Sequence, residues 1–236
     1  GKGKEYKDGK LIFECEYKNG KFWNGNIYNN YGKLMGEIKE GKGNIIEYDY
    51  DGSIIFEGEY LNGNINGKCK KYDNFHGIKF EGEYIDGKKG GKGKVYTIFN
   101  QLLFEGEFLD GKVNGKGKEF TVNFFNSNIK FEGNYINERK YGKGIEYDDN
   151  GRIIFQGEYL NGKKNGKCKV YKYFEKDNSN NNLKFLDEKN VKHEDNLIFE
   201  GEYINNKRNG KGKEYNKYGI LIYEGEIGRA SCRERV

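Results

Sequence analysis

One phrase recurs along this chain, and it constrains the fold more than any other feature. "FEGEYLNGNINGKCKKY" begins at Phe56 and "FQGEYLNGKKNGKCKVY" at Phe155, and close variants begin at Phe104 and Phe199. The third residue of the phrase, aligned from copy to copy, recurs at intervals that are mostly near 24 residues, at Cys15, Gly36, Gly58, Gly82, Gly106, Gly133, Gly157, Gly201 and Gly225. This period is too short for a pair of helices, so it indicates one small β unit repeated in tandem.

Each copy is typical of a β-hairpin. In Phe56-Glu57-Gly58-Glu59-Tyr60 the alternation places Phe, Gly and Tyr on one face and both glutamates on the other, as in a strand. An Asn-Gly or Asp-Gly pair then supplies the positive φ angles of a tight turn, and a polar loop such as "YDDNGR" reverses the chain again. The sequence therefore predicts an all-β fold, an elongated single-layer antiparallel sheet of tandem β-hairpins.

Glycine and aromatic residues must supply the core of such a sheet. The chain has 36 Gly, 20 Tyr and 16 Phe among 236 residues, and a glycine leaves bare backbone on which a neighbouring ring can lie. One hairpin alone buries too little to fold, so stability should come from stacking on neighbouring copies. We assign structural roles to Gly58, Gly82, Gly106, Gly133, Gly157 and Gly201.

The pattern divides the chain into a repeat array over residues 1–226, of about nine units, and a tail over 227–236. Residues 173–196, rich in Asn, Lys, Asp and Glu, are expected to be an expanded loop, with a decayed repeat around "NLKFLDE" as the alternative. The tail "IGRASCRERV" resembles a translated sequencing adapter, so we interpret it as non-native rather than as a genuine basic tail. The chain opens in the middle of a phrase, which indicates a fragment of a longer array.

The residues that usually carry chemistry are scarce. Two histidines, His76 and His193, lie in polar segments without a second ligand nearby, and three of the cysteines, Cys15, Cys69 and Cys168, occupy positions that are Gly in other copies. "GNINGKC" lacks the spacing and the Ser/Thr of a phosphate-binding loop, and the repeated glutamates are not a single acid–base pair. We therefore expect no catalytic residue, no metal and no cofactor, and hence no enzyme.

Charge is balanced along the repeats as well as in total. The net charge is +5, from 42 Lys+Arg and 37 Asp+Glu, and it falls to +3 without the tail. The lysines of each "GKGK" should form rows that alternate with glutamate rows about 4.8 Å away, so the rows cancel within a Debye length of about 8 Å. This favours exposed cross-strand ion pairs over a nucleic-acid surface, while binding to membrane lipid stays open.

The template Phe/Tyr-x-Gly-x-Tyr-x-Asn/Asp-Gly-x-x-x-Gly-x-Gly resembles the MORN repeat, the membrane occupation and recognition nexus. Clear copies start at Phe56, Phe80, Phe104, Phe155 and Phe199, and degenerate copies at Phe13, Leu34, Phe131 and Tyr223. The usual Trp at the second aromatic position is Tyr or Phe here, a change also found in MORN-like repeats of bacterial proteins labelled as antitoxins.

The resemblance implies a β-hairpin solenoid that acts as a non-catalytic interaction scaffold or spacer, with a protein partner or a second copy of itself. It also implies the alternative of a peripheral membrane or phospholipid tether, including the arm of a larger enzyme. The candidate binding residues are the repeat aromatics Tyr60, Tyr84, Phe108, Tyr135, Tyr159 and Tyr203. With no targeting signal and no apolar segment of membrane-spanning length, we expect a cytoplasmic location or one at a membrane surface.

Overall fold

The computed structural model describes residues 1–29, 31–49, 51–73, 77–122, 127–173 and 196–228. Its regular elements over these residues are strands without an α-helix. The strands are β1 (Lys2–Lys7), β2 (Lys10–Lys18), β3 (Lys21–Tyr28), β4 (Leu34–Lys39), β5 (Lys42–Tyr48), β6 (Ile54–Leu61), β7 (Asn64–Tyr72), β8 (Ile78–Ile85), β9 (Lys88–Tyr96), β10 (Leu102–Leu109), β11 (Lys112–Val122), β12 (Ser127–Ile136), β13 (Arg139–Tyr147), β14 (Ile153–Leu160), β15 (Lys163–Tyr171), β16 (Leu197–Ile204), β17 (Lys207–Tyr215) and β18 (Leu221–Ile227).

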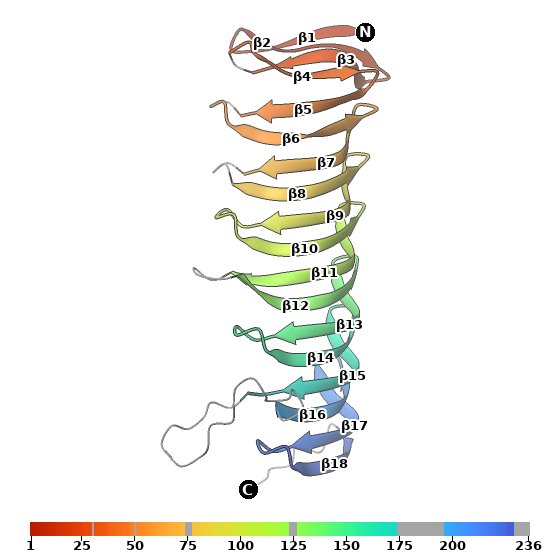
Figure 1. The fold of residues 1–236 in the computed structure, drawn as a ribbon. Coiled ribbons are helices and arrows are strands. Elements are labelled where there is room, and N and C mark those ends of the chain that lie inside the picture. The colour runs from red at the N-terminus through yellow and green to blue at the C-terminus, as the bar shows by residue number, and fades with distance from the viewer. Residues whose placement is uncertain (30, 50, 74–76, 123–126, 174–195, 229–236) are drawn as a thin grey trace, which may run out of the picture. The chain divides into compact units, whose positions relative to one another are not determined.

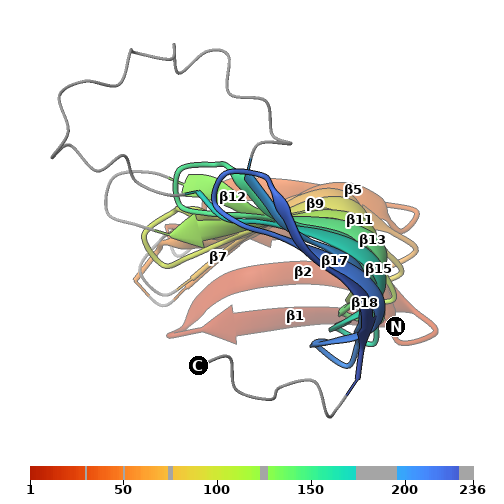
Figure 2. The same ribbon diagram turned by 90° about the horizontal axis from the view of Figure 1, so that it is seen from below.

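The chain divides into two compact units, Gly1–Ser127 and Asn128–Val236. Within each unit every strand pairs antiparallel with the next strand along the chain, as the ribbon shows (Figure 1). This confirms the predicted all-β fold of tandem antiparallel hairpins. Seen along the stack of strands, the strands bend along their length (Figure 2).

Two-residue turns join the two strands of each hairpin, along an edge of each unit that we call the turn edge. Asn62 and Gly63 have φ angles of 52° and 72°, both positive as the predicted Asn-Gly turn requires. Several of these turns are also bonded to the hairpin before them. The amide of Gly87 donates to the carbonyl of Ile65 at 2.8 Å, and that of Gly162 donates to Lys140 at 2.9 Å. The turns are therefore held at a fixed position relative to one another within a unit.

The longer connections between hairpins gather at the opposite edge, which we call the loop edge. Asn29 Oδ1 accepts the amides of Tyr31 and Lys33, both at 3.0 Å, and Asp148 Oδ1 accepts those of Asn150 and Arg152 in the same way. An Asn or Asp side chain that accepts hydrogen bonds from amides of its own loop stabilises a compact turn without contacts to other segments. The same loop geometry thus recurs between hairpins of different sequence.

Strand register aligns the glycines into one row per unit. Gly82 lies opposite Gly93 and Gly93 lies opposite Gly106, while in the second unit Gly133 faces Gly144 and Gly144 faces Gly157. Because side chains alternate along each strand, one face of the sheet carries the phenylalanines and the second aromatic residue of each repeat, and the other carries most of the Glu and Lys side chains. We call these the aromatic face and the charged face.

Some sequence predictions lie outside the described residues. They include both histidines, Cys232, almost all of the expected insertion over 173–196 and most of the expected tail over 227–236. On either side of the insertion β15 and β16 pair directly, with Cys168 opposite Gly201, so the glycine row continues across it.

Candidate interaction surfaces

The central glycines leave room for phenylalanine rings. A Cβ atom built on Gly82 would lie 2.8 Å from Cζ of Phe80 and 2.6 Å from Cα of Gly93, and one built on Gly93 would lie 2.7 Å from the same ring. A ring atom of the Phe two residues earlier comes within 2.7 or 2.8 Å in the same way at Gly58, Gly106, Gly133, Gly157 and Gly201. Any side chain at these positions would displace the ring, which is the physical reason for glycine here.

In three hairpins a cysteine replaces one of the two glycines that face each other in the glycine row. Cys69 lies opposite Gly58, Cys168 lies opposite Gly157 and Cys15 lies opposite Gly25. All three are free thiols with exposed fractions of 5% or 6%. Burial raises the pKa of the Cys69 and Cys168 thiols to about 11, so both are neutral at physiological pH. The structure supports their interpretation as small core residues.

The candidate binding aromatics lie mostly inside the molecule. Tyr84, Phe108, Tyr135 and Tyr159 have exposed fractions of 4% to 6%, while Tyr60 and Tyr203 are half-buried. Their rings pack edge-to-face on the core phenylalanines, for example Phe80 and Tyr84 with centroids 5.6 Å apart. This corrects the sequence-based assignment, since four of the six side chains cannot reach a partner while the sheet is intact. They are core residues.

On the aromatic face, Lys and Arg side chains lie over the phenylalanine rings. Lys140 Nζ lies 3.8 Å from the Phe131 ring centroid, Lys164 Nζ lies 3.9 Å from that of Phe155 and Arg208 Cζ lies 4.4 Å from that of Phe199.

Carboxylates neutralise two of these three cations, one from a strand two positions away and one from the same strand. Lys164 Nζ is 2.8 Å from Glu146 Oε2, and the Tyr159 hydroxyl donates to Glu146 Oε1 at 2.8 Å. Arg208 Nη1 is 2.8 Å from Glu214 Oε1. These half-buried networks serve the fold more than they attract an anionic ligand, because each charge is already paired.

A β-bulge in each typical hairpin was missed by sequence reasoning. Gly115 has a φ of 113°, and the side chain of Glu107 folds over it so that Glu107 Oε2 accepts the amide of Lys116 at 3.0 Å. A Glu side chain lies over a positive-φ Gly eight residues later in the same manner at Glu59 and Gly67, Glu83 and Gly91, Glu158 and Gly166, and Glu202 and Gly210. This fixed separation of Glu and Gly was the available signal.

The charged face carries the alternating rows that the sequence predicts. Lys70 Nζ lies 3.8 Å from both Glu57 and Glu81, and Lys94 Nζ lies 4.0 Å from Glu105. These side chains are a third to a half exposed, so each pair contributes little to stability.

Tyrosines on the charged face also bind the glutamate row. The Tyr72 hydroxyl donates to Glu57 at 2.6 Å and the Tyr147 hydroxyl donates to Glu132 at 2.7 Å. Burial, followed by these hydrogen bonds, raises the pKa of both tyrosines to about 12. Both hydroxyls are therefore protonated donors at neutral pH.

The turn edge presents aliphatic side chains. In the six hairpins from β6–β7 to β16–β17 the residue before the turn stands on the charged face, where the strand pattern calls for a polar side chain, yet it is Ile or Leu. The exposed members are Ile85, Leu109, Ile136, Leu160 and Ile204. Each pairs across its hairpin with a Lys or Arg, as Leu160 pairs with Lys163. Sequence reasoning missed this row because it sought binding residues among the aromatics.

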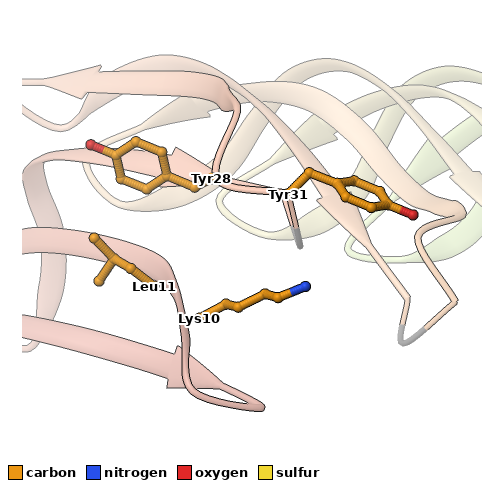
Figure 3. Close-up of a pocket in the computed structure, with 5 residues that line it drawn as sticks. Lys10, Leu11, Tyr28 and Tyr31 are labelled. Atoms are coloured by element: carbon orange, nitrogen blue, oxygen red, sulfur yellow. The ribbon is translucent and has the colours of Figure 1, made fainter.

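At the loop edge a surface hollow lies among Lys10, Leu11, Tyr28, Tyr31 and Gly32 (Figure 3). Its volume is about 590 Å³, and Tyr31 is 85% exposed, so the hollow is open to solvent. Lys10 Nζ is 5.7 Å from the Tyr31 ring centroid, a distance at which the cation–π attraction is weak. The hollow is lined by two tyrosines, a leucine, a lysine and a glycine.

The described residues contain neither a metal-binding cluster nor a membrane-spanning helix. Those residues contain no group of three or more His, Cys, Asp or Glu side chains arranged to hold a metal ion. Among the same residues, no helix has the length and apolar character needed to cross a bilayer.

Comparison with known proteins identifies one family. The model of the MORN repeat matches residues 56–74, 80–96, 104–123, 155–171 and 199–217, and no curated protein matches the chain. One of the solved structures that match is described as "Crystal Structure of TcdB2-TccC3 without hypervariable C-terminal region". It is 10% identical with a TM-score of 0.24, and the match covers 97% of this chain but only 14% of the other.

Proposed function

Because the chain is a MORN-repeat protein, we propose that it is a non-catalytic scaffold or spacer that holds partner proteins, or further copies of itself, along its repeats. In this proposal the chain works in the cytoplasm or at a membrane surface. Fold alone does not assign a function, so the proposal depends on how side chains are presented.

The observation that carries the proposal is the repetition of one exposed position in successive hairpins. On the turn edge of the second unit, Ile136, Leu160 and Ile204 are 45%, 44% and 49% exposed, and each precedes a turn. The turns that follow Leu160 and Ile204 are each bonded to the preceding hairpin, through Gly162 to Lys140 and through Asn206 to Lys164. A rigid line of equivalent contacts lets one partner bind several hairpins at once, with little entropic cost on the side of the scaffold.

The test is hydrogen–deuterium exchange on the full chain, alone and with each protein that binds it at a defined stoichiometry. Protection at equivalent positions of two or more successive hairpins is the expected result. A chain that stays a monodisperse monomer in light scattering and binds no protein would contradict the proposal, and so would protection confined to one isolated loop.

Membrane attachment is the second candidate, favoured by the exposed cations Arg139, Lys163 and Lys207 beside the aliphatic row. Lys or Arg next to exposed Ile or Leu is the composition of a surface that binds anionic lipid. The paired rows of the charged face weigh against it, since they add no net positive field. Flotation with anionic vesicles at low and physiological salt separates the candidates, because a lipid-binding surface should retain binding at physiological salt.

A further inference from the structure

The turn edge of the second unit combines aliphatic and cationic side chains in register. Ile136 pairs with Arg139, Leu160 with Lys163 and Ile204 with Lys207. All six side chains are exposed. We call these six residues the turn-edge band.

The cations of the band are free of carboxylate partners within the part of the chain that the structure describes. The turns beside them are Asn137-Glu138, Asn161-Gly162 and Asn205-Asn206, so Glu138 is the one acidic residue in these three turns. In the first unit the equivalent turns contain Asp86 and Asp110, and Lys88 is 3.3 Å from Asp110. Among the turns that follow an exposed Ile or Leu, the cationic character is therefore confined to the second unit, and a complementary partner would carry acidic residues.

The spacing of the band limits the shape of that partner. The aliphatic residues stand on β12, β14 and β16, two strands apart, and two strand spacings are about 9.4 to 9.8 Å. Seven residues of an α-helix rise about 10.5 Å, so residues i, i+7 and i+14 drift by roughly 2 Å at most over the three contacts. Long side chains can absorb this drift.

An extended partner fits less well. A polyproline helix repeats about every 9.3 Å, but its recognition depends on aromatic-lined grooves, whereas the band is aliphatic. A β-strand partner needs free backbone groups at a sheet edge, whereas β12 to β17 are paired in sequence from β12–β13 to β16–β17. The helix is the occupant that meets both the aliphatic and the cationic residues.

We propose that an acidic amphipathic helix of a partner protein docks along the turn-edge band, its apolar residues on Ile136, Leu160 and Ile204 and its carboxylates toward Arg139, Lys163 and Lys207. The helix would need at least 15 residues and a pattern of one apolar residue in seven, flanked by Asp or Glu. The proposal rests on the scaffold function proposed above and specifies the chemical class of the partner.

The probe for the test is a designed, fluorescein-labelled 21-residue helix with Leu at positions 4, 11 and 18 and Glu along one flank. Anisotropy is measured with the full chain at physiological salt. We expect saturable binding that weakens at least tenfold in the variant Ile136→Thr, Leu160→Thr, Ile204→Thr, since Thr keeps the β-propensity but removes aliphatic area. The variant Arg139→Gln, Lys163→Gln, Lys207→Gln should weaken binding about fivefold and flatten its salt dependence.

Matched controls use other exposed aliphatic residues. Ile220→Thr, Leu221→Thr, Ile222→Thr changes three exposed residues at the loop edge, and Ile85→Thr, Leu109→Thr changes the equivalent row of the first unit. Both variants should bind the probe within twofold of the parent chain. Thermal melting accompanies each variant, and the glutamine variant, which alters only exposed side chains, provides the test if the threonine variant does not fold.

Several outcomes would overturn the proposal. A Glu→Lys version of the probe that binds as tightly, or a proline-substituted probe that binds without being helical, would remove the acidic helix as the ligand. Binding of anionic vesicles that the threonine variant abolishes, with no binding of the probe, would assign the band to a membrane. If natural partners protect only the loop edge in hydrogen exchange, the scaffold function stands and the band proposal fails.

Discussion

The hairpins β4–β5 and β8–β9 share one architecture but differ in how the core is filled. In β8–β9 the Phe80 ring lies over Gly82 and Gly93, which face each other. In β4–β5 the residue at the phenylalanine position is Leu34, which is 52% exposed, and the position equivalent to Gly93 is Ile45, which is 3% exposed. The hairpin geometry therefore tolerates two solutions, a ring over two glycines or a branched side chain beside one glycine.

The two hairpins also differ in length, and the sequence records the difference. Gly82 and Gly93 are eleven residues apart, whereas Gly36 and Ile45 are nine residues apart. The missing two residues correspond to the bulge at Gly91, and β4 and β5 pair without a register shift, Ile38 opposite Gly43 and Lys39 opposite Lys42. A hairpin without the bulge lacks the glycine over which the glutamate side chain folds in the other hairpins.

The register of strand pairing also changes next to this hairpin, between β3 and β4. Gly36 lies opposite Ile27 instead of Gly25, which faces Ile38. A slip of two residues keeps every side chain on its own face, because the side-chain period of a strand is two. Ile27, Ile38 and Ile45 then form one aliphatic cluster. The comparison teaches that these repeats can lose residues in pairs while the sheet continues.

The largest expected effect comes from mixing the two core solutions. Gly93→Ile should destabilise the protein by about 3 kcal/mol or more, because its Cβ alone would lie 2.7 Å from the Phe80 ring. Phe80→Ala alone should cost about 3 to 5 kcal/mol through the cavity it leaves. The double variant should cost less than the sum by about 2 kcal/mol, as measured by urea unfolding in a double-mutant cycle.

The converse change in the N-terminal hairpin is the control. Ile45→Gly should cost about 3 to 5 kcal/mol, because no ring at position 34 is placed to fill the space. Strict additivity of Gly93→Ile and Phe80→Ala would show that ring and side chain do not compete for the same volume.

The second effect is the pH dependence of stability, which should differ between hairpins with a cysteine in the glycine row and hairpins with glycines alone. The Cys69 and Cys168 thiols have a pKa of about 11 when folded, because they are buried, against about 8.5 in an unfolded chain. The unfolded state loses these protons first as the pH rises, so stability is complete below pH 8.5 and falls as the pH rises through 11, by at most about 3 kcal/mol per thiol. Unfolding by urea at pH 8 and pH 10.5 measures the loss.

The double variant Cys69→Gly, Cys168→Gly restores the residue of the other copies and retains every tyrosine and lysine. Its stability should fall less between the two pH values than that of the parent chain. An equal fall in both proteins would assign the alkaline sensitivity to the tyrosines and lysines instead.

The third effect tests the bulge. Glu107→Ala should destabilise by about 1 to 2 kcal/mol, because the amide of Lys116 loses a charged acceptor. Glu37, which follows the central glycine in the hairpin without a bulge, forms an exposed ion pair with Lys39 at 3.1 Å. Glu37→Ala should therefore change stability by less than about 0.5 kcal/mol. Equal effects at the two positions would show that the bulge contact contributes nothing beyond surface charge.

Much of the fold could be predicted from the sequence, because the repeated phrase specifies it several times over. Alternation placed Phe56, Gly58 and Tyr60 on one face, and Asn62-Gly63 located the turn. The prediction that failed concerned exposure. A period of two assigns Tyr84 or Tyr159 to a face but does not tell whether that face is open. Here phenylalanines of the same and of the neighbouring hairpin, together with cations, cover it.

The turn-edge band escaped prediction for the complementary reason. Leu160 belongs to the charged face by alternation, and a single exposed leucine is ordinary in any protein. Its significance depends on Ile136 and Ile204 standing at equivalent places two strands away, which the strand pairing reveals. The bulge, in contrast, could have been predicted from the sequence, since Glu and Gly recur eight residues apart in five copies.

The smallest expected effect concerns the charged face, where the typical hairpins look most strongly paired. Lys70 lies between Glu57 and Glu81 at 3.8 Å from each, but these side chains are 35% to 43% exposed. Water and salt screen such pairs, and the long lysine side chain loses rotamer entropy when it is held. Lys70→Ala should therefore change the free energy of unfolding by less than about 0.5 kcal/mol at physiological salt. Lys164→Ala, which removes a half-buried cation from Phe155 and Glu146, should cost at least twice as much. If instead Lys70→Ala proves the more costly of the two, the charge rows rather than the covered aromatic face would be the main source of cohesion between hairpins.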